Sequence, residues 1–356
     1  MTWNIEWFPK NGQTTVDSVS TIIQALDMDL YAFQEISDTN MFKQMINNMD
    51  GYEYYFLSSW FGGLAYVYQS DHVQINSIYE IYTEQPYWRP FPRSPMLMEL
   101  TYQGQDYYII NNHFKCCGDE IMDLSDPWDE ETRRFDASNL LKEYIDLHLP
   151  DKNVIVLGDL NDVLTDVYEN NVFQTILDDE INYLFADIEI ANGSNSGWSY
   201  PSWPSHIDHI FITNELFDSF GNNSSIIQTI EIDNYMEGGF NAYDEIISDH
   251  LPVALMLAYD LDLIDNVMLP QNYYLTNYPN PFNPTTIISY KISEKGQVNV
   301  SIYNMNGQLI DQLVNQEMIP GTYSVTWNTS HVSSGLYFYK LAAGNQTITK
   351  KMLLLK

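Results

Sequence analysis

The first 260 residues alternate between short apolar segments of strand length and longer segments with helical spacing. Helices are expected at 17–27, 38–48 and 130–147; in the last, apolar side chains from Phe135 to Leu147 recur about every 3.6 residues. Strands are expected at Trp3–Trp7, Leu30–Phe33, Leu64–Tyr68, Met96–Leu100, Tyr107–Asn111, Val154–Leu157, Ile207–Ile212 and Pro252–Ala258. Because strands and helices mix without a strict alternation, the pattern predicts an α/β sandwich of two sheets.

The pattern changes after residue 275. Residues 278–284 contain Pro279, Pro281 and Pro284, which excludes a helix there. Short alternating strands are expected at 286–292, 297–304, 307–314, 321–327, 335–343 and 346–355. We therefore expect a domain at 1–260, a polar linker at 261–275 and a small all-β sandwich at 276–356.

Charge and composition narrow the protein class. The 356 residues suit two domains, and no run of about 18 apolar residues could span a membrane. The net charge is −33: residues 276–356 carry +3, so residues 1–275 carry −36. Such acidity repels nucleic acid at long range and favours a salty medium that screens it. Cys116 and Cys117 are adjacent and form no disulfide framework; two thiols, an inert pair or a strained bridge stay open.

Polar side chains able to do chemistry follow the apolar strands of the first domain. They occur as Trp3-Asn4, Gln34-Glu35, Asn111-Asn112-His113, Gly158-Asp159-Leu160-Asn161, and Asp208 with Ser248-Asp249-His250. Cleaving a phosphodiester requires a hard cation, a base that orients water and an acid that protonates the leaving oxygen. Glu35 is a natural cation ligand, and Asp159 with Asn161 could position the water. His113 and His250 could donate protons, and Asp208 could hold one imidazole in its donating tautomer.

These motifs, in this order, resemble the endonuclease/exonuclease/phosphatase superfamily. The histidine at position 113 makes the chain similar to the deoxyribonuclease I-like branch of that superfamily. The resemblance covers residues 1–258 and implies a four-layered α/β sandwich and Mg²⁺-assisted hydrolysis, with Mn²⁺ or Ca²⁺ as alternatives. The resemblance implies that Glu35 binds the metal with Asn4 and Asp249 beside it, and that Asp159 and Asn161 align the nucleophile. It also implies that Asp208 pairs with His250 at the scissile phosphate. His113 would then be the general acid, and Arg93 would approach the phosphate. One feature departs from the family: no carboxylate that would orient His113 is evident at 60–63, which reads Trp-Phe-Gly-Gly.

The C-terminal segment resembles a type IX secretion sorting domain. The resemblance rests on 278–285 (YPNPFNPT), on Ser334-Gly335-Leu336-Tyr337 and on the final 350–356 (KKMLLLK). It implies that the type IX secretion machinery is a partner and that the protein is secreted or lies on the bacterial surface. It also implies a Sec signal peptide, which is expected upstream of Met1 because the strand-like segment from Thr2 to Trp7 already begins at the second residue.

The sequence is compatible with three functions. The first is a secreted, monomeric endonuclease that hydrolyses DNA or RNA. The second is a phospholipid or sugar-phosphate phosphoesterase on the same fold, which the −36 charge favours. The third is a surface binding protein without activity, which the intact set of polar motifs argues against. In addition, the acidic run from Asp119 to Glu131 is expected to be a solvated loop, with weak Ca²⁺ binding as the alternative.

Overall fold

The computed structural model describes residues 1–56, 63–222, 224–258, 274–292, 295–304, 307–319, 321–344 and 346–354. The chain divides into two compact units, Met1–Ser20 with Met28–Asp260 and Thr21–Asp27 with Leu261–Lys356. Within the described residues, no helix is long and apolar enough to cross a membrane.

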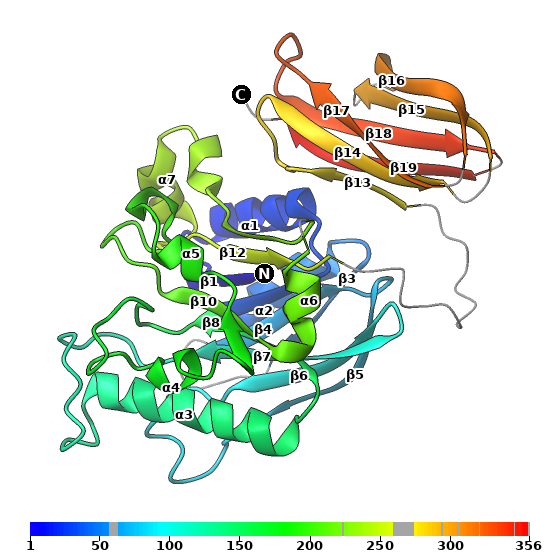
Figure 1. The fold of residues 1–356 in the computed structure, drawn as a ribbon. Coiled ribbons are helices and arrows are strands. Elements are labelled where there is room, and N and C mark those ends of the chain that lie inside the picture. Colours follow the sequence, from blue (N-terminus) through cyan, green and yellow to red (C-terminus); the bar gives the residue numbers. More distant parts are fainter. Residues whose placement is uncertain are drawn as a thin grey trace. The chain divides into compact units, whose positions relative to one another are not determined.

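Two six-stranded sheets form the centre of the first unit (Figure 1). The first sheet has the order β11 (Ile226–Thr229), β12 (Val253–Met256), β1 (Thr2–Phe8), β2 (Leu30–Ile36), β4 (Gly63–Gln69) and β3 (Tyr52–Phe56). The second has the order β5 (Val73–Glu80), β6 (Met96–Tyr102), β7 (Gln105–His113), β8 (Asn153–Asp159), β10 (Asp208–Thr213) and β9 (Tyr183–Phe185).

The inner faces of the two sheets pack against each other. Apolar side chains from both sheets, among them Leu64 of β4 and Leu157 of β8, form one buried cluster. The Tyr66 hydroxyl on β4 lies 2.8 Å from the carbonyl oxygen of Met96 and accepts the backbone N–H of Asn111 at 2.9 Å. Polar atoms in this apolar layer are therefore paired across the sheets.

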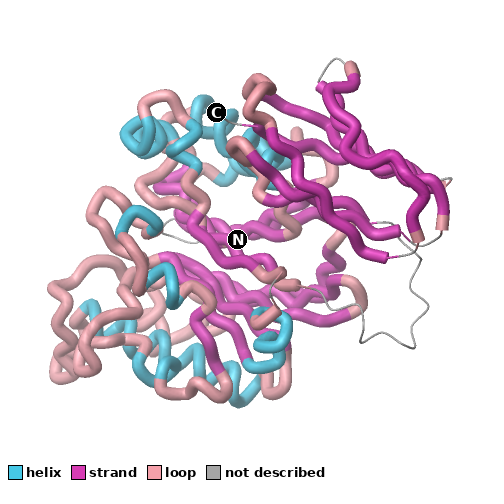
Figure 2. The backbone as a smooth tube through the Cα atoms, turned by 45° about the horizontal axis from the view of Figure 1, so that its top comes forward, coloured by secondary structure: helices cyan, strands magenta, loops and turns pink. Residues whose placement is uncertain are grey.

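Helices cover the outer faces (Figure 2). On the first sheet, Phe42 of α2 (Thr39–Asn47) packs edge-on against Phe8 and Phe33, with ring centroids 5.8 and 5.9 Å apart. On the second sheet, α3 (Glu130–His148) buries Leu141 and Ile145 in a cluster with strand residues. The remaining helices are α1 (Gln13–Leu26), α4 (Gln174–Leu177), α5 (Ile188–Ala191), η1 (Asn195–Gly197), η2 (Asn214–Leu216), α6 (Phe217–Phe220), η3 (Ile232–Tyr235) and α7 (Gly239–Ile246). The predicted α/β sandwich is confirmed.

The second unit is all-β among its described residues, apart from Thr21–Asp27. One sheet has the order β13 (Tyr274–Tyr278), β14 (Thr285–Ile292) and β17 (Gly321–Asn328). The other has the order β16 (Leu309–Met318), β15 (Gly296–Asn304), β18 (Gly335–Ala343) and β19 (Gln346–Leu354). Ile288 and Trp327 of the first sheet share a buried core with Val300 and Tyr339 of the second, which confirms the small sandwich. Strand β13 begins at Tyr274 and so includes the last two residues of the predicted linker 261–275, most of which lies outside the described residues.

Candidate active site

The predicted polar motifs meet where strands of both sheets end. In the second sheet, Asp159 at the end of β8 pairs in register with His113 of β7 on one side and with Asp208 of β10 on the other. In the first sheet, Asn4 of β1 pairs with Gln34 of β2, which places Glu35 one residue further on. Strand pairing aligns these side chains within each sheet, and a hydrogen bond between Asn4 and Asp159, 155 positions apart, joins the two sheets.

Irregular backbone aims these side chains. The register between β1 and β2 shifts after Asn4, and Glu35 has a φ of 65° in the left-handed region. Asn161, just after β8, has a φ of 54°. For residues other than glycine, an unusual backbone conformation costs about 1–3 kcal/mol of stability. Such conformations persist where the surrounding fold enforces them, often at functional sites. The strain therefore marks this strand edge as a candidate site.

Gly158 permits the close approach of β8 to β7. Its φ is +150°, and a Cβ atom there would lie 2.1 Å from the carbonyl oxygen of Asn112. Only glycine avoids both the clash and the backbone strain at this position. The Gly-Asp-x-Asn motif therefore has a structural requirement for its first residue.

Asn4 connects the two central carboxylates. Its Nδ2 donates to Asp159 Oδ2 at 2.8 Å and to Glu35 Oε1 at 3.3 Å. Its own Oδ1 accepts the backbone N–H of Glu6 at 3.0 Å. Asn4 thus holds Glu35 and Asp159 near each other, and its predicted role as a metal ligand stays a prediction.

His250 forms an ion pair with Asp208. Its Nδ1 donates to Asp208 Oδ2 at 2.8 Å, and its Nε2 lies 3.8 Å from both Asp159 Oδ2 and Asp249 Oδ1. Burial by itself lowers the pKa of His250, but the charges of Asp208, Asp159 and Asp249 outweigh it and raise the pKa to about 10. His250 is therefore a cation at neutral pH, with Nε2–H directed toward the carboxylates.

Asp159 lies at the centre of the cluster and is buried. Burial, together with the negative charges of Asp208 and Glu35, raises its pKa to about 7 despite the opposing effects of His250 and Asn4. Its Oδ1 accepts the backbone N–H of Asn161 at 3.1 Å. The Asn161 side chain reaches the carbonyl oxygen of Phe114 at 3.4 Å.

His113 faces the same carboxylates from the other side. Its Nε2 lies 3.5 Å from Asp159 Oδ2 and 3.8 Å from Glu35 Oε1. Burial, with the charges of Arg93 and His250, lowers the pKa of His113 well below its usual value. Among the described residues, no hydrogen-bond partner reaches its buried Nδ1. Residues 60–62, in the stretch where an orienting carboxylate is not evident in the sequence, lie outside the described residues.

Arg93 brings a positive charge to the cluster. Its burial lowers the pKa of the guanidinium, whereas the nearby charges of Glu35 and Asp159 raise it, and the net effect is a lowered pKa. The guanidinium is thus within the electrostatic reach of Glu35 and Asp159, and its own charge acts on His113. All nine predicted site residues are thus brought to one strand edge.

Two residues that complete this edge were not predicted from the sequence. Glu6 Oε2 accepts the backbone N–H of Asp249 at 2.9 Å, and its only sequence signal is its position two residues after Asn4. Tyr200, which lies in a turn without a catalytic motif, packs against His250 with ring centroids 4.8 Å apart. Burial, followed by the charge and hydrogen bond of Asp249, raises the pKa of Tyr200 to about 12.

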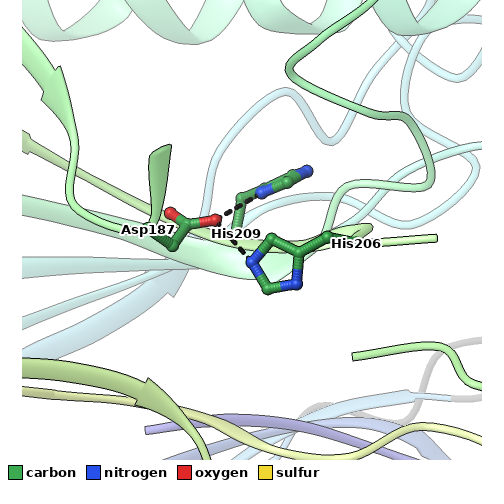
Figure 3. Close-up of side chains that lie close together, drawn as sticks. All are labelled: Asp187, His206 and His209. Atoms are coloured by element: carbon green, nitrogen blue, oxygen red, sulfur yellow. Dashed lines mark hydrogen bonds and ion pairs between the residues drawn. The ribbon is translucent and has the colours of Figure 1, made fainter. Parts of the chain in front are cut away.

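A second buried cluster adjoins the site but is saturated with hydrogen bonds (Figure 3). Asp187 Oδ2 accepts from His206 Nε2 at 3.0 Å and from His209 Nδ1 at 2.5 Å. His209 Nε2 donates to the carbonyl oxygen of Asp162 at 2.8 Å, and His206 Nδ1 accepts the backbone N–H of Ser199 at 3.2 Å. Because every ring nitrogen has a partner, this cluster supports the start of β10, next to Asp208.

The donor set of the first cluster fits a hard divalent cation. Glu35, Asp159 and Asp249 offer carboxylate oxygens, and the buried Oδ1 atoms of Asp208 and Asp249 have no hydrogen-bond partner within the described part of the chain. Burial, followed by the negative charges of Asp208 and Glu35, raises the pKa of Asp159, and a cation bound beside it would offset these charges. Oxygen ligands of this kind suit Mg²⁺, Mn²⁺ or Ca²⁺.

Comparison with known proteins matches both parts of the chain. Residues 1–250 match the model of the endonuclease/exonuclease/phosphatase family, and residues 276–355 match that of a secretion system C-terminal sorting domain. No curated protein matches the chain.

Solved structures share the fold of the first part at low identity. A humanized D. rerio TDP2 is 13% identical, with a TM-score of 0.51 over 71% of this chain and 95% of its own. D. rerio TDP2 complexed with single strand DNA product is 12% identical, with the same TM-score and coverage. An endonuclease/exonuclease/phosphatase from Bacteroides vulgatus is 16% identical, with a TM-score of 0.50 over 72% of this chain and 97% of its own.

Proposed function

Because the chain belongs to the endonuclease/exonuclease/phosphatase family, we propose that it is an exported, divalent-metal-dependent phosphodiesterase that hydrolyses nucleic acid as an endonuclease. The observation that carries the proposal is the His250–Asp208 pair, at 2.8 Å, whose imidazolium faces Asp159. On the other side of Asp159, His113 lies within 4 Å of both Asp159 and Glu35. Carboxylates, an imidazolium and a neutral imidazole are thus held at one edge, as phosphoryl chemistry requires.

Each side chain has a role that follows from its charge. Glu35 and Asp249 would hold the metal, with Asn4 beside them, and the bound metal would neutralise charge on the phosphate. Asp159, with Asn161, orients the attacking water and accepts its proton. His250 donates from Nε2 to a phosphoryl oxygen while Asp208 keeps it protonated. Arg93 adds a second positive charge for the same phosphate.

His113 is assigned to the leaving oxygen. Its lowered pKa means that it is neutral in the free protein. A bound phosphate would add negative charge next to the ring and raise this pKa, because an opposite charge favours the protonated form. His113 would therefore gain the proton of a general acid only when substrate is present.

Exposed aromatic rings beside the site support a substrate with bases. Trp7, whose backbone N–H donates to Glu35 Oε2 at 3.1 Å, has 49% of its surface exposed. Trp203 is 75% exposed within the turn closed by Tyr200 and Ser205, and Tyr200 contacts His250. Bases stack on such rings with about 1–3 kcal/mol each. One protein that shares this fold, D. rerio TDP2, has been solved in complex with single strand DNA product, which agrees with the proposal.

The strong negative charge of the first unit favours a second candidate, a small or lipid phosphoester substrate. Purified protein should be assayed on plasmid DNA, RNA, sphingomyelin and inositol phosphates, each with Mg²⁺ or EDTA. We expect Mg²⁺-dependent nicking of plasmid DNA that Glu35→Gln and His250→Ala reduce by at least about 10²-fold. His72→Ala, which changes an exposed histidine paired with Asp29, is the control. Hydrolysis of only a small or lipid substrate would replace the endonuclease proposal, and EDTA-resistant activity would refute the metal role.

We also propose that the boundaries 1–260, 261–275 and 276–356 divide catalysis from delivery. Every proposed site residue lies at or before His250, and residues 276–356 contain only Glu294, Asp311 and Glu317 as acidic residues. A chain ending after Asp260 should keep its kcat/KM and lose export from a host with type IX secretion. A folded but inactive truncation would show that the second unit belongs to the enzyme.

A further inference from the structure

A compact group of carboxylates away from the catalytic cluster lies where the loop between β7 and α3 meets the first turn of α3. One carboxylate oxygen from each of Asp119, Asp129 and Glu131 lies within 4.8 Å of the other two. Asp119 is exposed, Asp129 is half-buried and Glu131 is buried. Clustering of acidic side chains in a loop is common, so the chemistry of the buried member decides what the group can do.

Glu131 has an oxygen to which no described residue donates. Its side chain is 3% exposed, and its Oε2 is buried without a hydrogen bond from the described part of the protein. Its other oxygen, Oε1, accepts the backbone N–H of Glu120 at 2.9 Å and pairs with Arg134 Nη2 at 3.1 Å. An unsatisfied buried acceptor costs about 1–3 kcal/mol, and more when it is charged. A bound cation would remove that cost.

The other two carboxylates have oxygens left to offer. Asp119 accepts the Ile121 N–H with Oδ1, and Asp129 accepts the Thr132 and Asp123 N–H groups with Oδ2. Each of these residues therefore has a second oxygen beyond the one used to shape the loop.

Positive charge at the cluster is already shared. Arg134 pairs with Glu131 and also donates through Nε to Asp162 Oδ2 at 2.7 Å. Its single charge thus serves two carboxylates, and the charges of Asp119 and Asp129 come in addition. A divalent cation is the species that would balance this excess.

The backbone is shaped around the Glu131 carboxylate. Gly118 has a φ of +119°, and a Cβ atom there would lie 2.0 Å from Glu131 Oε1 and 2.6 Å from Oε2. The chain at Gly118 can pass this close only because it lacks a side chain. The loop is therefore built to bring backbone and carboxylates together.

We propose that Asp119, Asp129 and Glu131 form a Ca²⁺ site that stabilises the loop following His113. Ca²⁺ accepts six to eight oxygen ligands at variable geometry, whereas Mg²⁺ demands a stricter octahedron, so three carboxylates on an irregular loop and the helix start beside it favour Ca²⁺. The loop follows His113 directly in the chain. Arg134, which pairs with Glu131, also holds its first residues, because its Nη1 donates to the carbonyl oxygens of Lys115 and Cys117 at 2.9 and 2.6 Å. We expect a Kd of about 10⁻⁴–10⁻³ M, as for extracellular Ca²⁺ modules.

The test is a calorimetric Ca²⁺ titration of the full chain in excess Mg²⁺. Asp119→Asn should weaken the affinity by at least about tenfold, since it removes one charged ligand. Asp126→Asn is the matched control, because Asp126 is an exposed aspartate of the same loop whose Oδ1 accepts the Trp128 N–H two residues on, as Asp119 does with Ile121. The control should bind Ca²⁺ like the unchanged protein. Asparagine keeps the Oδ1 acceptor in both variants, so both should fold.

Two further measurements make the result decisive. Trypsin cleavage after Lys115 should slow when Ca²⁺ is added to the unchanged protein and to Asp126→Asn, but not to Asp119→Asn. Glu35→Gln should leave the Ca²⁺ affinity of this site unchanged, which separates it from the proposed catalytic metal. The absence of Ca²⁺ binding, or an equal loss in Asp119→Asn and Asp126→Asn, would overturn the site. Loss of Ca²⁺ binding in Glu35→Gln would assign the cation to the catalytic cluster instead.

Discussion

Replacing Asp208 by asparagine should deprive His250 of its charge at neutral pH. The substitution keeps the size of the side chain and can still offer an oxygen to His250 Nδ1, but it removes the negative charge 2.8 Å away. His250 remains buried in the variant, and burial alone lowers its pKa. The charges of Asp159 and Asp249 continue to oppose this effect, so they limit how far the pKa falls.

The size of the change follows from the geometry. Two unit charges at this separation attract by roughly 6 kcal/mol at an effective dielectric constant of about 20. One pKa unit corresponds to about 1.36 kcal/mol, so the loss amounts to roughly 4 units. In the unchanged protein the pKa of His250 is raised to about 10. We therefore expect a value of about 6 in Asp208→Asn.

Histidine ring NMR reports this pKa directly, and His250→Gln identifies the signal among the seven histidines. Turnover should fall by about 10²–10³-fold at pH 8, where the variant imidazole is neutral and donates poorly. The deficit relative to the unchanged protein should shrink toward pH 6, as the imidazole regains its proton. The exposed Asp218→Asn serves as the control. A variant in which His250 still titrates near pH 10, or whose deficit is independent of pH, would refute the reasoning.

Three other outcomes follow from the structure. Burial raises the pKa of Asp159 to about 7, so protons compete with a divalent cation below that pH. The rise in Tm that Mg²⁺ causes, measured by calorimetry, should therefore be larger at pH 8 than at pH 5. An equal rise at both pH values would exclude Asp159 from cation binding. Gly158→Ala should lower the free energy of unfolding by about 2–5 kcal/mol in urea titrations, whereas Gly197→Ala, where a Cβ meets nothing within 4 Å, should change it little; equal effects would contradict the close approach. Asp187→Asn should cost about 3–5 kcal/mol, because it leaves the buried charge of His209 unbalanced, and an effect no greater than that of Glu189→Gln would count against the network.

The central strands and the catalytic motifs could be predicted because each has a local signal. Strands such as β8, with the apolar run at 154–157, are buried inside the sandwich and must be apolar. The polar residues that follow them stand out against this background, as Asp159 does after β8 and His113 does after β7. The sequence order of these motifs also resembles one family, which indicated the layered architecture.

In the first unit, the described strands that the pattern did not predict, β3, β5, β9 and β11, all lie at sheet edges. Most of their residues are partly or fully exposed in β3, β5 and β11, and β9 has only three residues, so none carries a strong apolar signal. Their existence is decided by the neighbouring strand to which they pair. The same holds for β13, which pairs with β14 although its sequence borders a proline-rich segment.

The motifs of the chain show which side chains can do chemistry, whereas folding selects which of them act together. Glu6 contacts Asp249 across 243 positions, and Tyr200 reaches His250 from a turn without any catalytic motif. Nothing in the sequence around Glu131 indicates that its Oε2 is buried without a hydrogen bond from the described residues. Burial, charge balance and pKa depend on atoms that folding brings from distant parts of the chain, and no local pattern of residues records them.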